Sequence, residues 1–211
     1  MRHLDSDAIK DLPSRYRAQF INSITGVKSA NLIGSVSKKG ETNLAIFSSV
    51  IHIGSHPALL GFILRPTTID RHSFTNIKET SVFTVNQIHS DIIDKAHQTS
   101  AKYDKKVSEF KATGLKEEYL NACKAPFVKA ASLKIACRYK SEYYIEDNAC
   151  RLIIGEVTDV YYDENIQASD GFLDITRSDA AGILGSDAYV KMVMLDRFAY
   201  AEPHQELKSK L

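Results

Sequence analysis

Side chains that could bind a phosphate group follow directly after an apolar run in the first third of the chain. Residues 58–64 are apolar and are bounded by His56-Pro57 and Arg65-Pro66, which is typical of a buried strand rather than a helix. The next residues supply two guanidinium groups and three hydroxyls, from Arg65, Thr67, Thr68, Arg71 and Ser73. Guanidinium groups form strong charge-assisted hydrogen bonds to phosphate. The pattern therefore predicts an anion site at the end of a rigid strand.

A stretch upstream of this apolar run is rich in small residues. Residues 42–53 have the composition of an extended segment, in which Ala45, Ser48 and Ser49 leave little side-chain bulk. A flat ligand could therefore approach the backbone closely there and accept hydrogen bonds from N–H groups. Residues 70–79 fit a short helix, whose first turn would add unpaired N–H groups beside the predicted anion site.

Most of the remaining chain has the periodicity of short strands. We expect strands at 30–37, 58–64, 81–85, 132–144, 151–162 and 189–198, helices at 14–24 and 89–101, and a helical turn at 117–120. This balance predicts a mainly β fold, an antiparallel barrel with peripheral helices. Tyr16, Phe20 and Ile24 form one stripe of the first helix, which ends before Gly26, and we expect the stripe to pack on the barrel.

Composition favours one soluble domain over residues 1–211. The chain has 44% hydrophobic and 25% charged residues, enough to bury a sizeable core. A formal charge of +1, with no basic half, argues against nucleic acid or an anionic membrane as the main partner. No apolar run is long enough for a membrane span, and no signal-like segment is present, so we expect a cytoplasmic protein. The three cysteines lack CxxC spacing and are expected to be reduced thiols.

Several other kinds of site find little support. Neither GxGxxG nor GxxxxGK[ST] is present, so a nicotinamide nucleotide would have to use the same cleft as any other cofactor. His52 and His56 have a helical metal-ligand spacing, but Gly54 and Pro57 favour a strand end and a turn. No GxSxG nucleophile motif occurs, and we predict neither a metal site nor a catalytic protein side chain.

Four segments of the sequence resemble, in their order and spacing, segments of a known family. NLAIFSSV (43–50), LRPTT (64–68), RHSFTNI (71–77) and ETSVFTVN (79–86) resemble the flavin reductase-like family of FMN-binding split barrels. Downstream, TSAKYDKKVSEF (99–110) with Gly114-Leu115, and ILGSDAY (183–189), resemble further family segments. The resemblance covers residues 24–197. The chain departs from the family pattern at Ile46, where the family has proline, and at Ser49, where it has an aromatic residue.

The resemblance implies a split β-barrel that is antiparallel and Greek-key-like, with its core at 24–198 and a tail at 199–211. It implies FMN as cofactor, held by residues from the motifs above: Asn43, Ala45, Ile46, Phe47, Ser48, Ser49, Arg65, Thr67, Thr68, Arg71, Ser73, Asn86 and Ser100. It also implies a homodimer with the flavin near the interface, to which Ser100, Tyr103 or Tyr189 of the partner subunit could contribute.

The implied activity is an oxidoreductase in which NAD(P)H reduces the bound FMN and electrons pass to a flavin or another small-molecule acceptor. FMN takes the hydride itself, so the protein has to place the ring and aim donors at the charge that develops. Two alternatives remain open. The chain could bind FMN as a non-enzymatic electron carrier, or it could be a split-barrel binding module for another phosphorylated planar ligand.

Overall fold

The computed structural model describes all 211 residues, and its centre is one seven-stranded antiparallel sheet with the order β3-β2-β6-β9-β10-β5-β4. The strands are β2 (Asn31–Val36), β3 (Thr42–Phe47), β4 (Ile51–Ser55), β5 (Ala58–Leu64), β6 (Val82–Gln87), β9 (Lys134–Ile145) and β10 (Cys150–Tyr161). Two smaller sheets are formed by β1 (Lys28–Ser29), β11 (Ala181–Leu184) and β12 (Ala188–Lys191), and by β7 (Glu117–Glu118) and β8 (Phe127–Val128).

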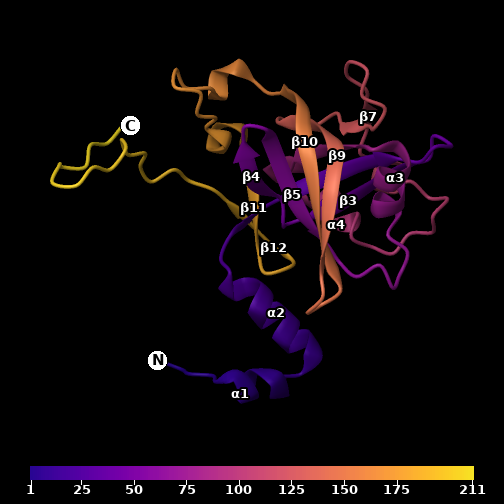
Figure 1. Ribbon diagram of the computed structural model, residues 1–211, viewed down its shortest axis with the longest axis horizontal. Helices are drawn as coiled ribbons and strands as arrows, with labels where there is room; N and C mark the ends of the chain where they lie inside the picture. Colours follow the sequence, from indigo (N-terminus) through magenta and orange to yellow (C-terminus); the bar gives the residue numbers. More distant parts are fainter.

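Helices are short and lie at the periphery (Figure 1). They are α1 (Ser6–Asp11), α2 (Ser14–Ile24), α3 (His72–Thr80), α4 (Ile93–Gln98) and α5 (Glu109–Thr113), with 3₁₀ turns at Ser90–Ile92, Glu164–Ile166 and Ile175–Ser178. No helix combines the length and the apolar character that crossing a bilayer requires.

The two edge strands of the large sheet, β3 and β4, are consecutive in the chain. β3 ends at Phe47 and β4 begins at Ile51, and a link of three residues can span no more than roughly 14 Å. The sheet must therefore curl until its edges meet at this link, although no hydrogen-bonded ladder joins β3 to β4. The result is an antiparallel barrel that is open between these edges, as predicted. Strand β6 lies between β2 and β9 rather than beside β5, the strand before it in the chain. This crossover makes the barrel Greek-key-like.

Strand β2 is buried along its whole length because its two faces enter two different cores. Leu32 belongs to a cluster with Leu44 and Phe110, whereas the next residue, Ile33, belongs to a cluster with Phe62 and Phe83. Alternate residues of a strand point to opposite faces, so one strand can serve both cores. The central strands are thus held rigidly, and with them the strand ends that form the site.

Several predicted elements are confirmed. The helix at 14–24 and the strand at 58–64 have the predicted bounds, and Gly26 follows the helix with a φ of +78°. The strands at 30–37, 81–85, 132–144 and 151–162 correspond to β2, β6, β9 and β10 with small shifts of their ends. His52 lies in β4 and His56 in the turn that follows, which confirms the strand and turn interpretation for this pair.

Other predictions at the periphery are wrong. Residues 117–120 contain strand β7, and the nearby helix is α5 at 109–113. The predicted helix at 89–101 is confirmed only over 90–98, where a 3₁₀ turn is followed by α4, and its predicted last three residues are not helical. The predicted strand at 189–198 ends at Lys191, because its partner β11 has only four residues to pair with it. Beyond this point Val193 is 72% and Leu195 91% exposed.

The apolar stripe of α2 does not pack on the barrel. No residue of α2 is buried, and Tyr16 and Ile24 are 53% and 62% exposed. In Figure 1, α1 and α2 project from the body on the N-terminal side, and the C-terminal residues extend away from it as a separate arm. Both ends of the chain therefore present apolar side chains that the rest of the chain does not cover.

Candidate functional site

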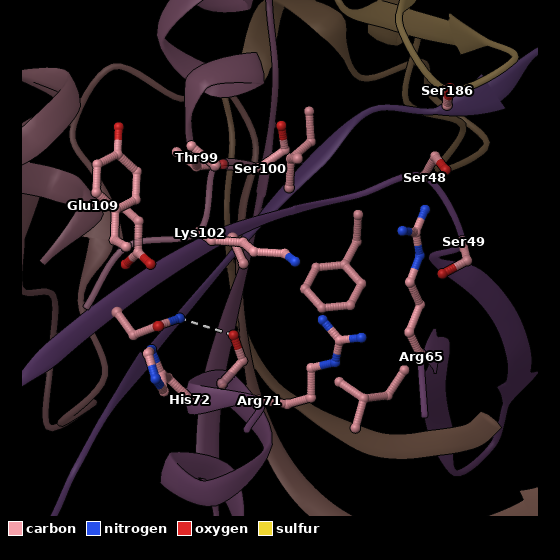
Figure 2. A pocket seen from close by; sticks show the side chains of 18 of the residues that line it. Ser48, Ser49, Arg65, Arg71, His72, Thr99, Ser100, Lys102, Glu109 and Ser186 are labelled. Carbon is pink, nitrogen blue, oxygen red and sulfur yellow. Dashed lines mark hydrogen bonds between the residues drawn. The ribbon is translucent and has the colours of Figure 1, made fainter. Parts of the chain in front are cut away.

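A cleft of about 470 Å³ lies between the end of β3 and the end of β5 (Figure 2). Its wall is built from the end of β3 and the Ser48-Ser49 link, the end of β5, the start of α3 and residues 97–103, which begin at the end of α4. Asn22 of α2 and Ser186 of the β11–β12 turn close one side. Two buried strands and one helix thus deliver polar groups to the gap between β3 and β5.

Hydrogen bonds fix the link between β3 and β4. Ser49 Oγ accepts from Ile63 N at 3.0 Å and donates to Ile63 O at 3.3 Å, and Ser29 Oγ donates to Val50 O at 3.2 Å. The hydroxyl of Ser49 is therefore occupied within the chain. Ser48 Oγ has no hydrogen-bond partner in the chain and is the hydroxyl of this link that a ligand could use.

Strand β3 presents a free backbone edge to the cleft. The outward N–H of Leu44 donates to Glu109 Oε2 at 2.9 Å, so the Gly34–Leu44 pair does not exchange ladder bonds with β2. Because the ladder alternates with a period of two, the N–H of Ile46 also faces outward, and Ile46 lines the cleft. Phe47, the next residue, packs edge-on against Phe62 with ring centroids 4.9 Å apart. The small side chain of Ala45 leaves this edge open to a flat ligand.

The start of α3 presents unpaired donors and positive charge to the cleft. Its first-turn N–H groups have no partners within the helix, and Arg71 at the N-cap makes no capping bond. Arg71 Nε donates to Pro66 O at 3.2 Å, which leaves the two terminal nitrogens of the guanidinium free. Lys102 makes no hydrogen bond or ion pair in the chain. In Figure 2 the ends of Arg71 and Lys102 point from opposite walls into the middle of the cleft.

Ser73 and Asn43 connect this helix to β3. Asn43 Nδ2 donates to Ser73 Oγ at 2.8 Å, and both side chains are buried. The bond sets α3 at a fixed position relative to the free edge of β3. A ligand with a planar ring on the strand and an anionic group at the helix would therefore meet a pre-formed site.

Most of the residues predicted for the site are brought together. The cleft is lined by Asn43, Ala45, Ile46, Phe47, Ser48, Ser49, Arg65, Arg71, Ser73 and Ser100. Thr67 and Thr68 do not line it; both lie in the exposed turn after β5. Ser100 and Tyr103 line the cleft of their own chain.

Asn86, which was also predicted for the site, is a core residue. Its Nδ2 donates to Leu32 O at 3.1 Å and to Thr84 Oγ1 at 2.9 Å, and its Oδ1 accepts from Val128 N at 2.9 Å. The side chain is fully buried, so these bonds satisfy a polar group that would otherwise be costly in the core. Asn86 therefore ties β6 to β2 and β8 and does not reach the cleft.

Sequence reasoning missed the charged and titratable groups contributed by His72, His97, Lys102 and Glu109. Lys102 follows the Thr99-Ser100-Ala101 segment directly, and this adjacency was a usable signal. His97 Nδ1 lies 3.1 Å from Tyr189 Oη. Burial raises the pKa of Tyr189 to about 12, so the phenol stays protonated at neutral pH. Tyr189 itself does not line the cleft and acts on it through His97.

Glu109 is a buried carboxyl at one end of the cleft, 6% exposed. Burial raises its pKa above the ordinary value of 4.5, and the bond from the Leu44 N–H only partly opposes this effect. Because the folded state holds this proton more tightly than the unfolded state does, the protonated carboxyl contributes its full stability at pH values below its unfolded pKa. That stability is lost as pH rises through the folded pKa.

The neutral variant Glu109→Gln should therefore gain stability relative to the wild type as pH rises from 4 to 7, because the buried carboxyl of the wild type ionises over this range and the amide does not. Glutamine also keeps an acceptor for Leu44 N. Glu109→Ala should lose about 1–3 kcal/mol at pH 4, because it leaves that N–H unpaired, and less at pH 7, where the wild type is itself destabilised by the ionised carboxyl. Urea unfolding at the two pH values measures both effects. Equal pH dependence in wild type and Glu109→Gln would contradict the assignment.

Comparisons with known proteins agree with this geometry. Residues 26–180 match the family model described as Flavin reductase like domain. The crystal structure of a protein with a split barrel domain from Shewanella frigidimarina NCIMB 400 is 46% identical in sequence, with coverage of 95% of this chain and 100% of that chain and a TM-score of 0.92.

More distant structures share the fold. Nitrilotriacetate monooxygenase component B from Bacillus cereus is 18% identical, with 93% of this chain and 98% of that chain covered and a TM-score of 0.81. The FMN-binding protein from Thermus thermophilus is 14% identical, with 90% and 96% covered and a TM-score of 0.71. Because the family model matches most of its length, the chain belongs to the flavin reductase-like domain family.

Proposed function

We propose that the protein is an FMN-dependent oxidoreductase in which NAD(P)H reduces the bound flavin and a small molecule or a second flavin takes the electrons. The observation that carries the proposal is the pairing, in one cleft, of a free strand edge with an anion site. Ile46 on β3 offers an outward N–H, and Arg71, Lys102 and the start of α3 offer unpaired donors and positive charge. Family membership supports a flavin-related oxidoreductase.

FMN fits the groups that line the cleft. Its phosphate would take the free guanidinium nitrogens of Arg71, the ammonium of Lys102 and the N–H groups of α3. Each charge-assisted bond contributes on the order of 1.5–3 kcal/mol, so two or three, together with ring burial, suffice for micromolar affinity or better. The FMN-binding protein of the same fold supports FMN as the flavin.

FMN supplies the redox chemistry when bound, since its ring both accepts and donates a hydride. The residues of this chain have other tasks. β3 orients the ring through its backbone, Arg71 and Lys102 fix the phosphate, and Phe47 packs the strand end against the core. The Tyr189 hydroxyl holds the His97 ring at the rim.

We also propose that the protein is a homodimer in which the two projecting ends cover each other's apolar side chains. Tyr16 and Ile24 on α2 are exposed, as are Leu195 and Tyr200 in the C-terminal arm, at 91% and 92%. Large exposed apolar patches are typical of interaction surfaces. α2 also contributes Asn22 to the cleft rim, so this interface would adjoin the flavin site.

Sedimentation equilibrium should therefore give twice the chain mass of 23.5 kDa. Ile24→Glu should shift the protein towards the monomer, because a charge would be buried at the interface. Ala18→Glu, on the opposite face of α2, is the matched control and should leave the dimer intact. A monomeric wild type would refute the dimer proposal and would leave the proposed flavin site in the cleft unaffected.

Anaerobic mixing of the FMN-loaded protein with NADH or NADPH tests the proposed activity. Rapid loss of flavin absorbance with either nucleotide, followed by recovery when an acceptor is added, is the expected result. Bound flavin that keeps its absorbance in both nucleotides, but is reduced by dithionite, would instead support the electron-carrier alternative.

A further inference from the structure

Arg65 stands apart from the other cations of the cleft. It follows β5 directly, and in Figure 2 its guanidinium extends towards Ser48, on the side of the cleft away from Lys102 and Glu109. Arg65 makes no hydrogen bond or ion pair within the chain, although it lines the cleft. The hydroxyl of Ser48 beside it is likewise without a partner in the chain. The two side chains form a donor pair that the fold itself does not use.

The charges in the cleft exceed what one phosphate needs. A phosphate monoester carries close to two negative charges. Arg71 at the start of α3 and Lys102 on the opposite wall already supply two positive charges. Two acids line the cleft, and neither neutralises Arg65. Glu109 is held at the opposite end by Leu44 N, and Asp70 is exposed and forms no ion pair.

The second ligand of the reaction has to come to this same cleft. The chain has no GxGxxG segment or phosphate-binding loop that could hold a dinucleotide elsewhere. Arg65 and the hydroxyl of Ser48 lie apart from Arg71 and Lys102, and they are suited to an anionic group on a ligand that arrives after the flavin.

We propose that Arg65 and Ser48 form a second anion subsite, which binds a phosphate or carboxylate group of the electron donor or acceptor while FMN occupies the rest of the cleft. This inference rests on the proposed function and refines it, because it names the chemical class of the second ligand. It also separates Arg65 from the FMN phosphate, to which sequence reasoning had assigned it.

The test starts by titrating the wild type with FMN and then adds small probes to the loaded protein, with flavin absorbance and fluorescence as readouts. Adenosine 2′-monophosphate probes for a phosphate-bearing donor, benzoate for a carboxylate-bearing acceptor, and benzamide is the neutral counterpart. The variants are Arg65→Ala, Arg65→Lys and, as a control of equal charge change, Lys39→Ala in the exposed turn after β2. Arg71→Ala serves as the reference for loss of FMN affinity.

Arg65→Ala should weaken binding of one or both anionic probes by about tenfold or more. The affinity for benzamide should not change, and the affinity for FMN should change by less than about threefold. Arg65→Lys should restore part of the loss, and Lys39→Ala should behave as the wild type. The probe that is affected identifies the source of the anion. A loss of FMN affinity as large as that in Arg71→Ala, or probe binding independent of Arg65, would overturn the subsite. A wild type that binds no FMN would instead overturn the proposed function, and the first titration reveals this before any probe is added.

Discussion

Replacing Arg71 and Lys102 together with alanine should weaken FMN binding by about 10²–10⁴-fold and leave riboflavin binding almost unchanged. The two side chains project from opposite walls into the middle of the cleft (Figure 2), and their free donors suit the phosphate that riboflavin lacks. Losing charge-assisted bonds from two groups removes roughly 3–6 kcal/mol, which corresponds to this change in affinity. Flavin fluorescence titration with both ligands measures the difference.

The double variant Thr67→Ala, Thr68→Ala is the matched control. The sequence assigns these hydroxyls to the phosphate, whereas the structure places them outside the cleft, so FMN affinity should stay within about twofold of wild type. Equal losses for FMN and riboflavin in the Arg71, Lys102 variant would mean that the cleft has been deformed and that the phosphate assignment is unsupported.

Gly34→Ala should destabilise the fold by about 3 kcal/mol or more. A Cβ at this position would lie 2.2 Å from Pro126 O and 2.6 Å from Thr84 Oγ1, in the middle of the 2.7 Å hydrogen bond that joins those atoms. A backbone carbonyl cannot rotate away as a side chain can. Gly34 also pairs with Leu44, so movement of β2 would disturb the strand edge that lines the cleft.

Gly54→Ala in the edge strand β4 is the comparison, because its Cβ would meet only Pro57 O at 3.4 Å, an ordinary contact. Denaturant unfolding of both variants should give a much lower midpoint for Gly34→Ala and a nearly normal one for Gly54→Ala. Similar midpoints would show that the backbone near Pro126 can move to accommodate the added Cβ, and that β2 is less tightly fixed than its surroundings indicate.

Elements that are bounded by proline or glycine could be predicted closely from the sequence. The strand at 58–64 lies between two prolines, and the helix at 14–24 lies between Pro13 and Gly26. Such residues restrict backbone conformation locally, so their effect does not depend on distant contacts. The polar residues directly after β5 and at the start of α3 reach the cleft for the same reason, since rigid elements carry them there.

The wrong predictions have a different cause. The type of a residue does not specify where its side chain lies in the fold or which group it contacts. Thr67 and Thr68 have the right chemistry, but neither lines the cleft. Asn86 could serve equally as a ligand group or as a core amide, and only the packing of β6 between β2 and β9 selects the second role. The stripe on α2 predicts that the helix buries one face, without stating that the covering surface belongs to the same chain. Glu109 lies in a charged segment, where nothing local marks it as buried.

The most direct test of FMN binding is the visible absorption spectrum of the purified protein, before and after addition of FMN and removal of free flavin by gel filtration. Flavin absorption bands should elute with the protein at one FMN per chain. A colourless protein that does not retain added FMN would contradict the flavin assignment, and would leave the split barrel with a cleft for another ligand.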